Sequence, residues 1–247
     1  MKRYSLAAIL LSSIVSTVAW AGSFTVGVEA TEYMPISKGD GGGAYTGYAR
    51  ELLDAFAAKY GHTFTYKPFP VVRLSDEFAV KKSLDFKFPD NPYWGGDSKK
   101  GVTIVYSKGV VTVTEGLMVA TANKGKGLAN IAKIGTIRGF TPFPYLDQIK
   151  AGKIAVTEVT TAEAAISMVE AGRVDGVYMA QMVGNYIMTE VMKKPAILVY
   201  DSKLPNSSND FSFSTIAHPE VIKQMDEFLL KEKDTVAKLK AKYKIVE

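Results

Sequence analysis

The chain has 247 residues, of which 47% are hydrophobic and 22% are charged, and it contains no cysteine. This is the composition of a globular protein, and it excludes disulfide scaffolds, cysteine zinc sites and thiol chemistry. With only two histidines, a multi-histidine metal site is almost excluded. The net charge is +5, but the basic residues are scattered among acidic ones, which disfavours nucleic acid as a partner.

The first residues have the pattern of a targeting segment. Lys2 and Arg3 precede the mostly apolar run 6–19, and small residues flank Trp20. A membrane-spanning helix needs roughly 20 apolar residues, so this run is short for the alternative, an uncleaved anchor. We therefore predict a signal peptide over residues 1–21 and an exported mature chain whose formal charge is +3 once Lys2 and Arg3 are removed.

The mature chain begins with an α/β pattern. Apolar residues alternate over 24–28, which predicts a half-buried strand. After a long connection, apolar residues recur at helical spacing from Ala49 to Tyr60, and Gly61 stands where a left-handed C-terminal cap is expected. Residues 64–69 predict a second strand, so the order strand, loop, helix, strand is typical of a parallel sheet.

A second unit of the same kind follows in the middle of the chain. Residues 134–137 and 154–159 predict strands, and the segment Thr160–Glu163 has the pattern of a capping box at the start of a helix. Gly172 ends this helix, and residues 174–179 predict the next strand. Two α/β units are therefore expected, without a sequence repeat between them.

Short motifs follow one another along the mature chain. They are Gly47-Tyr48 with Glu51-Leu52-Leu53 and Lys59-Tyr60-Gly61, then Pro70-Val71-Val72-Arg73, Tyr106-Ser107, Arg138-Gly139, Glu170-Ala171-Gly172-Arg173-Val174-Asp175-Gly176, and a last helix after His218-Pro219. Their order and spacing resemble the type II periplasmic solute-binding proteins, specifically solute-binding family 3, which includes the amino-acid receptors of ABC transporters. The resemblance covers nearly all of the mature chain.

The resemblance implies an α/β protein of two lobes joined by hinge strands, with a ligand held in the cleft between them. It places residues 22–114 and 213–247 in lobe 1, and residues 115–212 in lobe 2. Such lobes close on the ligand, so a transporter or sensor can distinguish loaded from empty protein. We therefore expect a periplasmic monomer that binds a small molecule, serves an inner-membrane ABC permease or a sensor kinase, and needs no cofactor or metal.

The chain departs from the amino-acid receptors at both ends of the ligand. In those receptors an Arg before the first hinge clamps the ligand carboxylate, yet the corresponding stretch 90–100 contains none. The acidic residue that meets the ligand ammonium is replaced by Ala180. An ordinary α-amino acid is therefore not the expected ligand.

The residues that remain to line a cleft are mostly aromatic or polar. We predict that the ligand-binding residues are Tyr33, Tyr48, Arg73, Trp94, Arg138, Phe140, Thr141, Tyr178 and Gln181. Aromatic walls with a few oriented polar groups suit a partly apolar or ring-containing ligand. For each aromatic residue the alternative is a place in the core or on the surface.

Local context supports three of these residues in particular. Arg73 follows a predicted strand, where side chains of α/β proteins face a cleft, although a structural ion pair is the alternative. Thr141 precedes a predicted helix and can cap it while exposed backbone N–H groups meet the ligand. Trp94 lies in a loop rich in Pro and Gly, where a large aromatic residue is typical of a contact surface.

Three functions remain open. The first is capture of a small organic solute without covalent chemistry, and we predict this one because no catalytic constellation is evident in the sequence. The second is an enzyme on the same scaffold, similar to periplasmic dehydratases of cyclic acids, in which Glu29 or Glu32 acts as acid or base. Otherwise either carboxylate is a ligand partner or, as we expect by default, a solvated loop residue. The third is an accessory protein whose cleft meets another protein.

Overall fold

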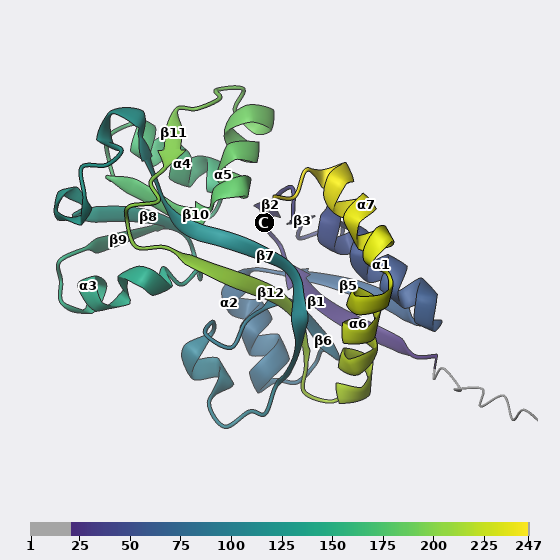
Figure 1. Ribbon diagram of the computed structural model, residues 1–247. Coiled ribbons are helices and arrows are strands. Elements are labelled where there is room, and N and C mark those ends of the chain that lie inside the picture. Colours follow the sequence, from purple (N-terminus) through teal and green to yellow (C-terminus); the bar gives the residue numbers. More distant parts are fainter. Residues whose placement is uncertain (1–20, 247) are drawn as a thin grey trace, which may run out of the picture.

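The computed structural model describes residues 21–246 and consists of two α/β lobes (Figure 1). Two long strands, β7 (Val105–Ala120) and β12 (Ser207–Thr215), run from one lobe into the other. The signal peptide predicted for residues 1–21 lies, apart from its last residue, outside the described part of the chain. Among residues 21–246, no helix combines the length and the apolar character that crossing a membrane requires.

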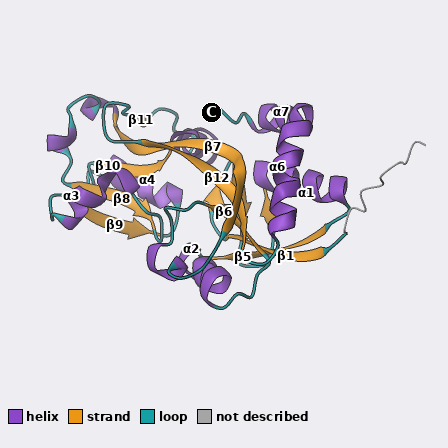
Figure 2. Cartoon of the chain, turned by 60° about the horizontal axis from the view of Figure 1, so that its bottom comes forward, coloured by secondary structure: helices purple, strands orange, loops and turns teal. Residues whose placement is uncertain are grey.

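Lobe 1 contains both ends of the described chain. Its main elements are β1 (Ser23–Glu29), α1 (Tyr48–Tyr60), β5 (Thr63–Phe69), α2 (Val71–Ser75), β6 (Phe86–Asp90), α6 (Pro219–Lys231) and α7 (Lys233–Tyr243). β1 pairs in parallel with β5 on one side and with β6 on the other. In Figure 2, α1, α6 and α7 lie on one side of these strands and α2 lies on the other. The two predicted strands and the helix that ends at a left-handed Gly61 are confirmed.

β1 presents two different faces, because successive side chains of a strand point to opposite sides. Val26 and Val28 belong to the main core, which also contains the apolar residues of α1. Gly27 faces α2, and a Cβ there would lie 2.4 Å from Leu84 Cδ1 and 2.6 Å from Leu74 Cδ1, so a larger residue would displace these side chains. Glu29 follows two residues later on the same face as Gly27, at the carboxyl end of the strand.

The connection after β1 forms a small antiparallel sheet of its own. Its strands are β2 (Glu32–Tyr33), β3 (Ser37–Gly39) and β4 (Tyr45–Thr46). The sequence pattern predicts only a loop here, because strands of two or three residues show no periodicity. Gly39 lies so close to β1 that a Cβ would be 2.2 Å from the carbonyl oxygen of Glu29. This sheet therefore covers the end of β1 and positions Tyr33.

Lobe 2 is the second α/β unit. Its elements are β8 (Lys133–Ile137), α3 (Leu146–Lys150), β9 (Ala155–Val159), α4 (Ala162–Glu170), β10 (Gly176–Ala180), α5 (Gln181–Tyr186) and β11 (Leu198–Tyr200). The three predicted strands are confirmed, and β8 pairs in parallel with β9 and β10. The predicted capping box is wrong by one residue. Thr161, with extended φ and ψ of −135° and 152°, is the cap, and its Oγ1 accepts from the Ala164 N–H at 3.1 Å.

One nine-stranded sheet passes through both lobes, in the order β5-β1-β6-β12-β7-β10-β8-β9 with β11 paired to β7. β12 pairs antiparallel with β6 of lobe 1 and with β7, and β7 continues to β10 of lobe 2. The predicted two-lobe α/β fold with hinge strands is confirmed. The predicted lobe boundaries, after residues 114 and 212, fall inside β7 and β12, and they stay a prediction.

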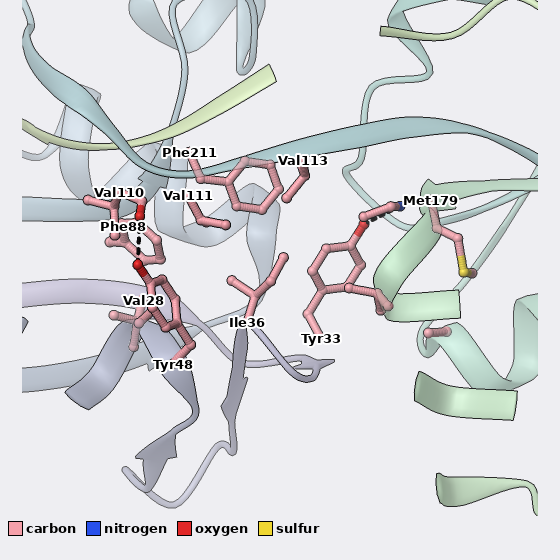
Figure 3. Close-up of a cluster of buried hydrophobic side chains, with 14 of the residues drawn as sticks. Val28, Tyr33, Ile36, Tyr48, Phe88, Val110, Val111, Val113, Met179 and Phe211 are labelled. Atoms are coloured by element: carbon pink, nitrogen blue, oxygen red, sulfur yellow. Dashed lines mark hydrogen bonds between the residues drawn. The ribbon is translucent and has the colours of Figure 1, made fainter. Parts of the chain in front are cut away.

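The core of lobe 1 extends to the hinge and to lobe 2 (Figure 3). The buried Tyr48 hydroxyl donates to the Val110 carbonyl oxygen of β7 at 2.9 Å, which ties α1 to the hinge. Tyr33 extends from the small sheet toward β10, where its hydroxyl accepts a hydrogen bond from the Ala180 N–H at 2.9 Å. Tyr33 therefore bridges the two lobes.

Candidate ligand-binding site

A cavity of about 340 Å³ lies between the lobes. Lobe 1 lines it with the ends of β1 and β6, with Tyr33, with α2 and with the loop after β6. Lobe 2 contributes the loop after β8 and one residue of β10, and the hinge contributes one residue each of β7 and β12. A cavity of this size is within the roughly 300–1,000 Å³ of small-molecule sites.

Five of the nine predicted residues line this cavity. They are Tyr33, Trp94, Phe140, Thr141 and Tyr178. The rings of Tyr33 and Phe140 meet edge to face across the lobes, with centroids 5.2 Å apart. Trp94 meets Phe211 of β12 in the same manner at 4.9 Å. Phe211, which the sequence reasoning missed, also lines the cavity. The wall is therefore built from aromatic side chains of both lobes and the hinge.

The other four predicted residues lie elsewhere. They are Tyr48, Arg73, Arg138 and Gln181, none of which lines the cavity. Tyr48 belongs to the core, and Gln181 lines a separate groove that α5 shares with the C-terminal residues after α7. The side chains of Arg73 and Arg138 are 62% and 64% exposed, and they pair with Glu77 at 3.4 Å and Glu158 at 3.9 Å. Both arginines follow strands, as predicted, but their elements turn them toward solvent.

Thr141 lines the cavity without capping a helix. The short 3-10 helix Phe143–Tyr145 has no side-chain cap, and α3 begins only after it. The predicted cap is wrong because Pro142, which has no side-chain acceptor, occupies the cap position, and Pro144 in the first turn lacks a backbone N–H.

Two buried carboxylates were misjudged or missed by the sequence reasoning. Glu29 is 6% exposed at the end of β1, so the expectation of a solvated loop residue is wrong, because the small sheet covers this strand end. Glu115 is 4% exposed within β7. The signal for Glu115 was the alternation of the strand, in which it continues the buried positions Val111 and Val113.

Burial dominates the titration of both carboxylates. It raises the pKa of Glu29 to about 7, against the lowering effect of Lys87, and the charges of Glu115 and Asp90 raise it further. Burial also raises the pKa of Glu115 to about 7, although Asn209 Nδ2 donates to its Oε2 at 2.8 Å and lowers the pKa. Both carboxylates therefore lie in surroundings that disfavour an uncompensated negative charge.

The buried lysine that lines the cavity already has a partner. Lys87 Nζ lies 3.0 Å from Asp90 Oδ1, which also accepts from Lys99 Nζ at 2.6 Å. The Ser214 hydroxyl donates to Asp90 Oδ2 at 2.7 Å. Burial alone would raise the pKa of Asp90, but the two lysines lower it below its ordinary value. Lys87, Asp90 and Lys99 thus form a buried cluster, of which only Lys87 lines the cavity.

The Tyr178 hydroxyl is a polar group in the cavity wall that the protein itself leaves incompletely bonded. The residue is 1% exposed, and its Oη makes no hydrogen bond of standard geometry among the described residues, with the Ser207 side chain nearby. Burial and the charge of Glu115 raise the pKa of Tyr178, so the phenol stays protonated. It can accept from or donate to a molecule in the cavity.

The two lobes also touch through residues near those that line the cavity in the sequence. The rings of Tyr93 in lobe 1 and Phe143 in lobe 2 lie 5.6 Å apart. Gly139 of lobe 2 packs on α2, where a Cβ would lie 3.1 Å from Val71 Cβ. With the Tyr33 bridge, these contacts hold the lobes in a closed arrangement, and they would be lost if the lobes separated.

Two α/β lobes, a pair of hinge strands and a cavity between the lobes define the fold of the type II periplasmic binding proteins. An arginine transport-system periplasmic binding protein from Legionella pneumophila matches with a TM-score of 0.67 and 15% identity, over 90% of this chain and 99% of its own. An ancestral amino-acid-binding protein, AncCDT-1, a precursor of cyclohexadienyl dehydratase, matches with a TM-score of 0.67 and 19% identity, over 90% and 95%.

A histidine kinase sensor domain with similarity to periplasmic binding proteins has a TM-score of 0.69 and 18% identity, over 90% of this chain and 95% of its own. At such identities the likeness establishes the fold, and the resemblance noted in the sequence is confirmed at that level. No protein-family model and no curated protein matches the chain.

Proposed function

We propose that this protein is exported to the periplasm, where it captures a small organic solute between its lobes and presents it to an inner-membrane ABC permease or a sensor kinase. The binding step involves no covalent chemistry. The observation that supports this proposal best is the interlobe cavity, because its wall comes from both lobes and from both hinge strands. A ligand that contacts both lobes favours the closed state over the open one. A partner protein that distinguishes the two states can therefore detect whether ligand is bound.

The aromatic wall supports a ligand with an apolar or ring-shaped part. Tyr33, Trp94, Phe140 and Phe211 offer ring faces and edges, which contribute to binding mainly through buried apolar area. Arg73 and Arg138 point into solvent, so neither is placed to clamp a ligand carboxylate. The proposal therefore keeps ordinary α-amino acids out of the ligand class.

Native mass spectrometry of protein purified from its own periplasm tests this function by detecting a retained solute. We expect added mass in the wild type and in Val80→Ala, an exposed change outside the cavity, and reduced retention in Trp94→Ala. In a thermal-shift screen, the ligand at 100 times its Kd should stabilise the protein by about 2.7 kcal/mol. No added mass and no shift with any metabolite would contradict the proposal, and capture of a protein partner in that case would favour the accessory role.

A second candidate function rests on Glu29. A buried carboxyl with a pKa of about 7 in a cavity meets the first requirement for a general acid or base. The matched pair is Glu29→Gln and Glu32→Gln, since Glu32 is paired with Lys38 at the surface at 2.8 Å. Turnover of cyclic carboxylic acids that disappears only in Glu29→Gln, with substrate binding retained, would establish an enzyme. Absence of turnover in the wild type would leave the binding function.

A further inference from the structure

The charges that face the cavity are predominantly acidic. Four carboxylates line it, from Glu29, Asp76, Asp97 and Glu115, against a single cation, Lys87. Two of these acids have solvent-facing partners, since Asp76 pairs with Lys81 at 3.2 Å and Asp97 with Lys100 at 2.6 Å. The two buried acids, Glu29 and Glu115, therefore dominate the charge that a ligand inside the cavity would meet.

Glu115 has no cation beside it in the described chain. Its one hydrogen-bond donor is the neutral amide of Asn209. Burying a carboxylate without a cation beside it costs free energy, so the group either stays protonated or binds a positively charged partner. Lys87 does not serve this purpose, because its Nζ is held by Asp90 at 3.0 Å.

The surroundings of Glu115 suit a positively charged nitrogen. Ala180 of β10 lies opposite Glu115 of β7, and Tyr178 lies two residues earlier on the same face of β10. The Tyr33 hydroxyl accepts from the Ala180 N–H at 2.9 Å, so Glu115, Tyr33 and Tyr178 line one part of the cavity. The Tyr178 Oη is buried and without a regular hydrogen bond, so it can accept from an N–H group. Trp94 and Phe140 provide ring faces, which attract cations within about 6 Å.

Building on the function proposed above, we propose that the cavity binds an organic ammonium cation, a primary or secondary amine with an apolar or aromatic body and no carboxylate. The ammonium group lies between Glu115 and the Tyr178 hydroxyl, where it donates to both. The apolar body packs among Tyr33, Trp94 and Phe140. A ligand carboxylate is excluded for two reasons. It would lie near the acidic Glu29, and the positive charge of the neighbouring Lys87 is already balanced by Asp90.

The test is calorimetric titration of the mature protein, dialysed free of retained solute, with a matched series of small molecules. The amines are 2-phenylethylamine, tyramine and 1,5-diaminopentane, and the comparison compounds are 2-phenylethanol, 3-phenylpropanoate and phenylalanine. We expect at least one amine to bind about tenfold more tightly than 2-phenylethanol, because charge-assisted hydrogen bonds exceed neutral ones. The carboxylate and the amino acid should bind more weakly than the amine.

Glu115→Gln is the decisive variant, because it keeps the size of the side chain and an acceptor for Asn209 while it removes the charge. The affinity for the amine should fall by about tenfold or more, and that for the alcohol should stay unchanged. Tyr178→Phe should lower the affinity for the amine by a smaller factor. The exposed Glu163→Gln, outside the cavity, is the control, and circular-dichroism melting verifies that each variant is folded.

The outcomes separate this inference from the function on which it rests. If 2-phenylethanol or 3-phenylpropanoate binds as tightly as every amine, or if Glu115→Gln leaves amine binding unchanged, the ligand class is wrong and the solute-binding function stands. If no compound of the series and no solute from a metabolite extract binds, both are wrong.

Discussion

Asp90 of β6 and Glu115 of the hinge strand β7 are both buried acids, but their charges are balanced in different ways. Asp90 is fully buried and is neutralised by Lys87 and Lys99, so its pKa is lowered although burial acts in the opposite direction. Glu115 is almost as deeply buried but has only the Asn209 amide, and its pKa is raised to about 7. The negative charge of Asp90 is balanced by residues of the fold, whereas that of Glu115 is neutralised only by a proton or balanced by a cationic ligand.

A buried charge with a structural role differs from one that is available for function in the partners that the fold supplies to it. A carboxylate whose hydrogen bonds and counter-charges are supplied by the fold contributes to stability. A carboxylate in a cavity wall that has no counter-charge from the fold reduces the stability of the empty protein. Such a carboxylate is available to bind a ligand.

Asp90→Asn should destabilise the protein most, by roughly 3–5 kcal/mol, because it leaves Lys87 and Lys99 buried without their counter-charge. The free energy of unfolding from urea titration at pH 7 measures this change. Asp97→Asn is the matched control on the neighbouring loop. Its side chain is 91% exposed, and an exposed ion pair contributes about 0–1 kcal/mol. A loss below about 1 kcal/mol in Asp90→Asn would remove the distinction between the two sites.

Glu115→Gln should stabilise the empty protein at pH 8, by up to about 3 kcal/mol. Its folded pKa of about 7 exceeds the ordinary 4.5, so the folded state holds the proton more tightly than the unfolded state. The contribution of this residue to stability is therefore present below pH 4.5 and is lost as the pH rises through 7. Melting temperatures of wild type and variant without ligand should agree at pH 4.5 and diverge at pH 8, and parallel curves would contradict the prediction.

Arg73→Ala and Arg138→Ala should have the smallest effects, with unfolding free energies within about 0.5 kcal/mol of the wild type and unchanged ligand affinity. Their ion pairs are largely exposed, and neither side chain lines the cavity. Urea unfolding and the titration of the ligand identified by mass spectrometry are the measurements. A tenfold loss of affinity in either variant would mean that an arginine does reach the ligand.

Much of the fold could be predicted because its signals are local. The alternation of 24–28, the helical spacing up to Tyr60 and the left-handed Gly61 each depend on a few neighbouring residues, and the structure contains all three. The small sheet after β1 could not be predicted in the same way, because its strands are too short for periodicity. The small sheet packs against β1 at Gly39, and no local sequence pattern predicts this contact.

The site was predicted in part, and the division follows residue chemistry. Aromatic residues in loops, such as Trp94 and Phe140, do line the cavity, because large apolar groups are buried wherever an interface forms. Charged residues were assigned the wrong way round. Arg73 was expected inside and lies in solvent, and Glu29 was expected in solvent and lies inside, because the direction of a side chain depends on the packing of its element.

Composition and short-range periodicity are enough to predict an α/β chain with two units and without cysteine chemistry, and the cleft between two lobes follows from the resemblance of the motifs to a known family. Which charged side chains lie together in the interior depends on long-range packing. The register of β7 against β10 and the closure of the lobes bring Glu29, Glu115 and Tyr178 to one cavity from positions distant in the sequence. Such long-range coincidence arises from packing, which no local pattern encodes.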